Sequence, residues 1–157
     1  MKFEKLETTE AKFVGMYHEY INELYPGDIE YMSIDAAKEN CDMWFDREQC
    51  EVLYINNDNG LTIGFCIIGH KPECHSKADW HIFGFYILPE YRRNHYGMFA
   101  VAELIHRYGT KASLHILTSN ITGMLFWAKL AHMFGHHLTP NDHPELHIDG
   151  AVEYLID

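Results

Sequence analysis

The stretch that most constrains the fold is residues 80–108, where a long apolar run is followed by a basic loop and then by a second apolar segment. The run from Trp80 to Leu88 is rich in aromatic and branched side chains without strict alternation, which predicts a strand covered on both faces. Pro89 ends this strand, and Gly97 comes just before a helix predicted at 99–108. A strand, a short loop and a helix in this order indicate helices packed on a sheet.

The basic loop within this stretch, residues 92–98, is a candidate anion-binding site. It contains Arg92, Arg93, Asn94 and His95, and it leads into a helix whose first N–H groups and positive dipole end favour a negative charge. We expect an anionic ligand there, a phosphate group of a cofactor. A plain connection with surface arginines fits this stretch equally well when the stretch is taken alone.

The pattern of the remaining chain predicts the element order β-α-α-β-β-β-α-β-α-β-β, an α+β fold with one mixed sheet and helices on both of its faces. The predicted strands are 3–6, 51–55, 61–68, 80–88, 113–117, 136–138 and 152–156. The other predicted helices begin near Thr8 or Thr9, near Ser33 or Asp35, and at Asn120 or Thr122. In the second helix we expect a buried stripe of Ile34, Ala37, Cys41 and Trp44.

Length and charge narrow the function classes. With 157 residues the chain is expected to form one domain, residues 1–157. Its net charge of −11 argues against general nucleic-acid binding, which needs a basic surface. The charge suits a cationic substrate, although acidic surfaces more often serve solubility.

Three features of the sequence bear on where the protein is located. The cysteines lack a CxxC spacing, and the first ten residues lack an apolar leader. No apolar run reaches the roughly 20 residues of a membrane span. We therefore expect a cytoplasmic protein with reduced thiols and no membrane partner.

A first motif, residues 88–97, resembles the pyrophosphate loop of the GNAT superfamily, the acyl-CoA-dependent N-acetyltransferases. In that loop an Arg or Gln is followed three residues later by Gly, and two residues after that by Gly or Ala. Arg92 and Gly97 fit the pattern, whereas His95 stands at the first glycine. Glycine lets the backbone bend and approach a phosphate closely, so a side chain at position 95 crowds the ligand.

A second motif, residues 120–129, is similar to the family segment Asn-x-x-Ala-x-x-Phe-Tyr-x-Lys. Asn120, Phe126 and Lys129 match it, Gly123 replaces the alanine, and Trp127 stands at the tyrosine. The element order resembles that of the family over nearly the whole chain. The resemblance implies a three-layer α/β/α fold whose central mixed, mostly antiparallel sheet is splayed between its fourth and fifth strands.

The resemblance also implies which residues bind acetyl-CoA as the cosubstrate. The backbone from Tyr86 to Leu88 would bind the pantetheine arm, and Asn120 would contact the same arm, cap its helix, or do both. The amides from Arg93 to Met98 would bind the pyrophosphate while Arg92 adds positive charge. The full implied set is Tyr86, Ile87, Leu88, Arg92, Arg93, Asn94, His95, Tyr96, Gly97, Met98 and Asn120.

The implied reaction is direct attack of a primary amine on the thioester in a ternary complex. An alkylammonium with a pKa of about 10.4 must first lose a proton, so a base is needed. The fourth strand offers His81 and Asp79 for this role, and a histidine with a pKa of about 6.5 suits it. The alternative interpretation of His81 is a strand-edge residue that lies partly in solvent.

The general acid is not assigned by the motif. The family often uses a tyrosine at the position of Trp127, and a tryptophan cannot act as an acid at neutral pH. Tyr86, Tyr96, Tyr154 or solvent would then protonate the leaving thiolate. The altered motifs also leave a second function open, that of a catalytically weak GNAT-fold protein that binds acyl-CoA or a protein partner.

The acceptor is expected to be an amine, either a cationic small molecule or a protein amine, and the protein a monomer or homodimer. By family geometry the acceptor cleft would be lined by Tyr25, Asp28, Glu30, Tyr31 and Asp35.

The chain holds 12 histidines, among them His132, His136, His137, His143, His147 and the Cys74-His75 pair. They show neither an HExxH motif nor a Cys/His finger spacing. The adjacent pair His136 and His137 would point to opposite faces of a strand. We therefore expect no metal.

Overall fold

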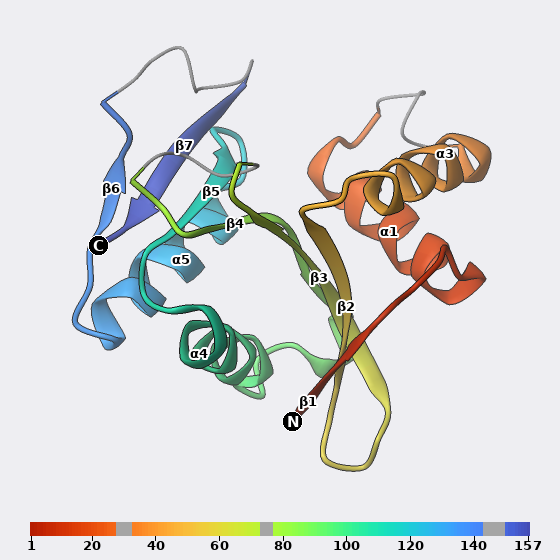
Figure 1. Ribbon diagram of the computed structural model, residues 1–157, viewed down its shortest axis with the longest axis horizontal. Coiled ribbons are helices and arrows are strands. Elements are labelled where there is room, and N and C mark those ends of the chain that lie inside the picture. Colours follow the sequence, from red (N-terminus) through yellow and green to blue (C-terminus); the bar gives the residue numbers. More distant parts are fainter. Residues whose placement is uncertain (28–32, 73–76, 143–149) are drawn as a thin grey trace. The chain divides into compact units, whose positions relative to one another are not determined.

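The computed structural model describes residues 1–27, 33–72, 77–142 and 150–157 (Figure 1). Within these residues seven strands form one sheet in the order β1-β2-β3-β4-β5-β7-β6, and the element order along the chain is the predicted one. β4 and β5 are parallel, whereas β1–β2, β5–β7 and β6–β7 are antiparallel. The chain divides into two compact units, one of Met1–Ile68 with Gly84–Ala100 and one of Gly69–Phe83 with Val101–Asp157.

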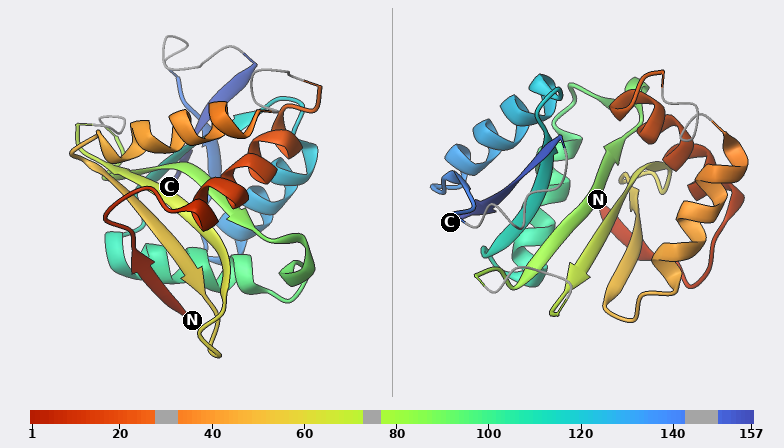
Figure 2. Two further views of the ribbon diagram at one scale, coloured as in Figure 1. Left: turned by 90° about the vertical axis from the view of Figure 1, so that its right-hand side faces the viewer. Right: turned by 90° about the horizontal axis from the view of Figure 1, so that it is seen from above.

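The first unit is built around an aromatic core between helices and strands. Its elements are β1 (Lys2–Lys5), α1 (Ala11–Leu24), α3 (Ile34–Phe45), β2 (Cys50–Asn56), most of β3 (Thr62–His70), the end of β4 (Trp80–Ile87), the short 3-10 helix η1 (Pro89–Tyr91) and the start of α4 (Tyr96–Tyr108). α1 and α3 lie side by side (Figures 1 and 2). Phe13 of α1 is fully buried, and its ring packs edge-on against Phe65 of β3 and Phe45 of α3.

Two details of these helices differ from the sequence prediction. α1 is capped by Glu10 without a side-chain hydrogen bond, because Thr9 donates instead to Asp42 of α3 and the Glu10 carboxylate accepts from the Tyr54 hydroxyl. Ile34 is 52% exposed rather than part of the buried stripe of α3. It is the first residue of its helix, one position after the N-cap Ser33, and its side chain faces solvent.

The second unit holds the remaining strands and helices. Its elements are the start of β4, most of α4, β5 (Ala112–Leu117), α5 (Ile121–Met133), β6 (Leu138–Pro140) and β7 (Ala151–Ile156). Trp80 to Ile82 of β4 pair in register with Ala112 to Leu114 of β5. All six residues of β5 pair in register with β7. Trp80 is fully buried, and its indole N–H donates to the carbonyl of Gly109 at 2.9 Å.

Two boundaries are shifted from the prediction. α4 begins at Tyr96, since the carbonyl of His95 already accepts from the Phe99 amide at 3.0 Å. β6 covers Leu138–Pro140 instead of 136–138, because the His136 amide still bonds the helix carbonyl of Ala131. None of the described helices is long and apolar enough to cross a membrane. Cys41, Cys50 and Cys66 form no disulfide, and Cys74 lies outside the described residues.

Candidate functional site

The loop between β4 and α4 has an unusual backbone. Arg93 and His95 both adopt the left-handed region with φ of 62°, which costs a non-glycine residue about 1–2 kcal/mol. At position 95 the family motif has glycine, and the histidine here takes up a conformation that glycine would adopt freely. Such strained residues cluster at ligand sites when the surrounding structure holds them in place.

This loop ends at the exposed start of α4. Because the first hydrogen bond of α4 joins Phe99 to His95, the amides of Tyr96, Gly97 and Met98 have no acceptor within the helix. The residues of the loop just before them, 93–95, are exposed. Backbone N–H groups and the positive end of the helix dipole therefore lie where an anion can reach them.

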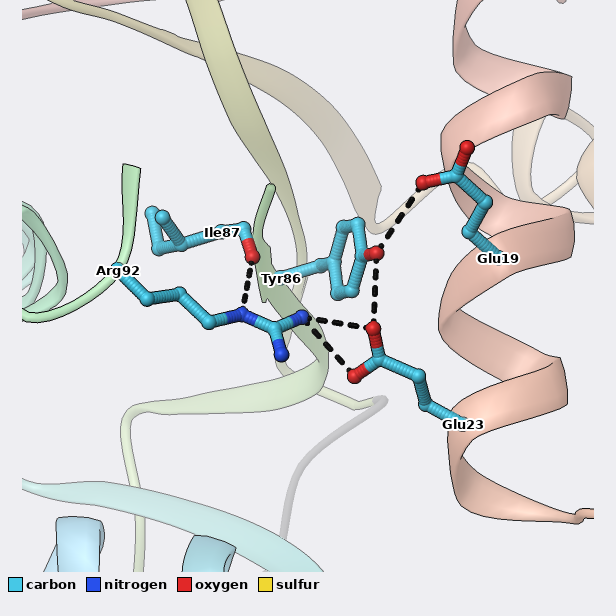
Figure 3. A network of polar contacts seen from close by, with 5 residues as sticks. All are labelled: Glu19, Glu23, Tyr86, Ile87 and Arg92. Carbon is cyan, nitrogen blue, oxygen red and sulfur yellow. Dashed lines mark hydrogen bonds and ion pairs between the residues drawn. The ribbon is translucent and has the colours of Figure 1, made fainter. Parts of the chain in front are cut away.

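Arg92 points towards β4 and α1 (Figure 3). Its Nε donates to the carbonyl of Ile87 at 2.7 Å, and one terminal nitrogen donates to both oxygens of Glu23 at 2.9 Å. The amide of Leu88, in the same peptide unit as the Ile87 carbonyl, donates to Ile63 of β3. Since the two groups of a peptide unit point in opposite directions, Arg92 covers the edge of β4 that faces away from β3.

Tyr86 connects this arginine to two carboxylates of α1 (Figure 3). The guanidinium of Arg92 lies 5.1 Å from the centre of the Tyr86 ring. The Tyr86 hydroxyl lies 3.1 Å from Glu23 and 3.3 Å from Glu19. Burial and the Glu23 carboxylate raise the pKa of Tyr86 well above its ordinary value, so the phenol stays protonated at neutral pH. The two glutamates and one arginine leave a net negative charge at this place.

A glycine of β3 permits this arrangement. A Cβ added to Gly64 would lie 2.0 Å from the carbonyl oxygen of Tyr86, a distance that no side chain can occupy. Gly64 therefore lets β3 approach β4 closely where Tyr86 is positioned. Sequence reasoning does not single out Glu19 or Glu23. Their spacing of four residues, which places both on one helix face, is the one sign of them in the sequence.

The two predicted bases lie in the second unit, in contrasting surroundings. His81 is 3% exposed, so it is not the half-solvated strand-edge residue of the alternative interpretation. Its Nδ1 lies 2.7 Å from the hydroxyl of Ser113, and burial together with His115 lowers the pKa of His81 to about 3. Asp79 is exposed, and its carboxylate accepts from Lys71 at 3.2 Å. A catalytic role for either residue stays a prediction.

Asn120 is the N-cap of α5, as one of its two expected roles requires. Its side-chain oxygen accepts from the amide of Gly123 at 2.9 Å. A Cβ at Gly123 would lie 2.4 Å from Asn120 Nδ2, so the glycine makes room for the cap. Trp127, at the position of the family tyrosine, is 7% exposed and belongs to the buried side of α5. Contact of Asn120 with a pantetheine arm stays a prediction.

The residues expected around the acceptor are only partly described. Tyr25 is the C-cap of α1, and Asp35 lies in the first turn of α3. Asp28, Glu30 and Tyr31 lie outside the described residues, as do His75, His143 and His147.

Comparison with known proteins identifies the fold. The model of the acetyltransferase (GNAT) family matches residues 13–132. A GNAT-family protein from Desulfovibrio desulfuricans is 11% identical with a TM-score of 0.64, over 99% of this chain and 96% of that chain. An acetyltransferase from Thermus thermophilus is 9% identical with a TM-score of 0.66, over the same shares. Mutant forms of the spermidine/spermine N-acetyltransferase from Vibrio cholerae are 16% identical with a TM-score of 0.61, over 99% and 93%. These likenesses show the fold alone. No curated protein matches the chain.

Proposed function

Because the chain belongs to the acetyltransferase (GNAT) family, we propose that it transfers an acetyl group from acetyl-CoA to a primary amine, by direct attack of the amine on the thioester in a ternary complex. The observation that carries the proposal is the loop of residues 92–98. It presents three helix-start amides after two residues held in the left-handed conformation. In this proposal residues 1–157 act as one catalytic domain.

The pyrophosphate of acetyl-CoA is bound by the amides from Arg93 to Met98, and these residues are exposed or half-buried. The pantetheine arm runs along the backbone of Tyr86, Ile87 and Leu88. Its amide N–H needs the Ile87 carbonyl that Arg92 occupies at 2.7 Å. Arg92 therefore releases this carbonyl when the cofactor binds, and its charge becomes available to the phosphates. Asn120 stays a predicted contact of the same arm.

The acceptor is a cationic amine bound by Glu19 and Glu23. These carboxylates flank the Tyr86 hydroxyl within 3.3 Å, and Glu23 loses its guanidinium partner when Arg92 moves. An ammonium group can take the place of the guanidinium there, since it carries the same charge and donates hydrogen bonds. For the proton that the ammonium must lose, the chain offers the two glutamates besides the predicted bases His81 and Asp79.

The first experiment measures binding and turnover separately. Calorimetry with acetyl-CoA should show one site, and release of free thiol should follow when an amine is added. In a panel of monoamines, diamines, polyamines and a lysine peptide, we expect the polycationic amines to react fastest. Glu23→Gln should raise the KM for amines while acetyl-CoA still binds. The absence of any binding at about millimolar acetyl-CoA would contradict the proposed function.

The loop assignment has a matched pair of variants. His95→Asp and His95→Asn both tolerate a positive φ, but only aspartate adds a negative charge beside the phosphates. At about 4 Å in water-exposed surroundings such a charge costs about 1 kcal/mol or more, so His95→Asp should bind acetyl-CoA at least about fivefold more weakly than His95→Asn. Equal affinities of the two variants would place the pyrophosphate elsewhere.

A second candidate function is an acyl-CoA-binding protein with weak catalysis. It is favoured by Trp127, which is buried where the family often has its acidic tyrosine and which cannot donate a proton at neutral pH. The two functions differ in one result. Binding of acetyl-CoA without thiol release across the whole amine panel would support the second.

A further inference from the structure

A cluster of imidazole and carboxylate groups lies inside the second unit, whereas the loop and the glutamates described above belong to the first. His81 of β4 is in register with Ser113 of β5. His115 of β5 stands directly opposite Glu153 of β7. Side chains of residues in register, and of residues two apart on one strand, share a face of a sheet. The topology therefore brings His81, Ser113, His115 and Glu153 together on one face.

Three of these side chains converge at distances suited to a metal ion. One ligand atom from each of His81, His115 and Glu153 lies within 4.8 Å of the others. His81 Nε2 and His115 Nδ1 are 3.3 Å apart. Two nitrogens bound tetrahedrally to zinc at about 2.0–2.1 Å are separated by about the same distance. Glu153 Oε1 lies 3.9 Å from Nδ1 of His81, so the carboxylate would have to turn towards Nε2 to complete the set.

Two of the three ligand side chains, His81 and Glu153, also have a second polar partner on the side away from the proposed ion. His81 Nδ1 lies 2.7 Å from the Ser113 hydroxyl, which leaves Nε2 as the nitrogen aimed at His115. The outer oxygen of Glu153 accepts from the Asn141 side chain at 2.6 Å. Metal-binding histidines and carboxylates typically have a second hydrogen bond of this kind, which fixes their orientation.

The charge of the cluster also favours a cation. Glu153 is 3% exposed, and a buried carboxylate needs a compensating positive charge or a proton. Among the described residues no lysine or arginine forms an ion pair with Glu153, and its one ion-pair neighbour is the His81 ring at 3.9 Å. In the part of the chain that the structure describes, the hydrogen-bond donor to this carboxylate is the uncharged side chain of Asn141.

We propose that His81, His115 and Glu153 bind a divalent metal ion of the zinc type, with three protein ligands and a fourth position open to water. Two imidazoles and one carboxylate are ligands that Zn²⁺ accepts in a tetrahedral site. No local sequence motif predicts this site, because its two histidines are 34 residues apart and come from different strands. A bound ion would use the Nε2 lone pair of His81, so His81 would then not be the proton acceptor in acetyl transfer.

The test is metal binding by the full chain after treatment with a chelator. Titration with Zn²⁺ should show one tight site that is weakened at least tenfold in His115→Ala and in Glu153→Gln. Ser113→Ala should weaken it about 10–100-fold through the orientation of His81. Titration with Co²⁺ should give the visible absorption bands of a four-coordinate ion in the wild-type protein and not in His115→Ala.

The many other histidines make a control necessary. His106 is an exposed residue of α4, and His106→Ala should bind Zn²⁺ as tightly as the wild type. Unchanged affinity in His115→Ala or Glu153→Gln, or the absence of four-coordinate Co²⁺ bands in the wild type, would overturn the proposal. If a variant does not fold by circular dichroism, the wild-type Co²⁺ spectrum and Ser113→Ala decide. These readouts do not involve acetyl-CoA, so they stand whether or not the proposed function holds.

Discussion

His95 holds a backbone conformation that its side chain disfavours, with φ of 62° in a loop that the family builds with glycine. His95→Val should destabilise the protein relative to His95→Gly by about 2 kcal/mol, because a β-branched residue fits the left-handed region least well. Urea unfolding of the two variants measures this difference. A matched pair at Glu103, in the interior of α4, should show the opposite order, since glycine in a helix interior is unfavourable. The same order at both positions would mean that φ at position 95 is not positive in solution.

Contacts between individual side chains are the hardest feature to predict from the sequence. The ion pair of Arg92 with Glu23 joins residues 69 positions apart, and no local sequence pattern predicts it. Thr9 is a plausible cap by type, yet its hydroxyl bonds Asp42 on another helix. Asn120 is predicted as a cap and is one, because a cap needs only an amide three residues away. Local hydrogen bonds can thus be predicted, whereas those between distant segments depend on how the elements pack.

At the scale of the element, variants of Asn120 at the N-terminus of α5 distinguish its role as a helix cap from its expected role as a contact of the pantetheine arm. Asn120→Asp keeps the acceptor oxygen that caps Gly123 but removes the amide donor, whereas Asn120→Ala removes both. We expect the alanine variant to lose about 1 kcal/mol of unfolding free energy and the aspartate variant to lose little. If Asn120 also donates to the pantetheine arm, calorimetry should show weaker acetyl-CoA binding in Asn120→Asp. Unchanged affinity there would leave Asn120 a cap alone.

Elements themselves were predictable to different degrees. α1 has apolar residues at helical spacing, and among them Phe13, Met16, Tyr17 and Ile21 are buried, whereas Tyr20 and Leu24 are half-buried. The strand predicted at 136–138 begins two residues before β6, because the three residues of β6 carry no alternation that distinguishes them from the end of α5. Long amphipathic segments carry enough residues to define a face, and short edge strands do not. The clusters that depend on register, such as His81 with His115, are therefore beyond what periodicity can predict.

At the scale of the whole molecule, several buried acids make the fold sensitive to alkaline pH. Burial and Asp42 raise the pKa of the Cys41 thiol to about 12. Burial and the Glu10 carboxylate raise the pKa of Tyr54, and burial with Glu23 raises that of Tyr86. In the unfolded chain a cysteine titrates at about 8.5 and a tyrosine at about 10. Above those values the unfolded state loses protons that the folded state keeps.

Stability should therefore be constant with respect to these groups below about pH 8.5 and fall as the pH rises towards 12, by up to about 1.4 kcal/mol per pH unit for each proton released. Urea unfolding at pH 8 and pH 10.5 measures the loss. Tyr54→Phe removes one titrating group while its partner Glu10, which is exposed, remains hydrated. Because this variant releases about one proton fewer on unfolding, its free energy of unfolding should fall less steeply above pH 10 than that of the wild type. A free energy of unfolding that does not change between the two pH values would show that these side chains reach water in the folded protein.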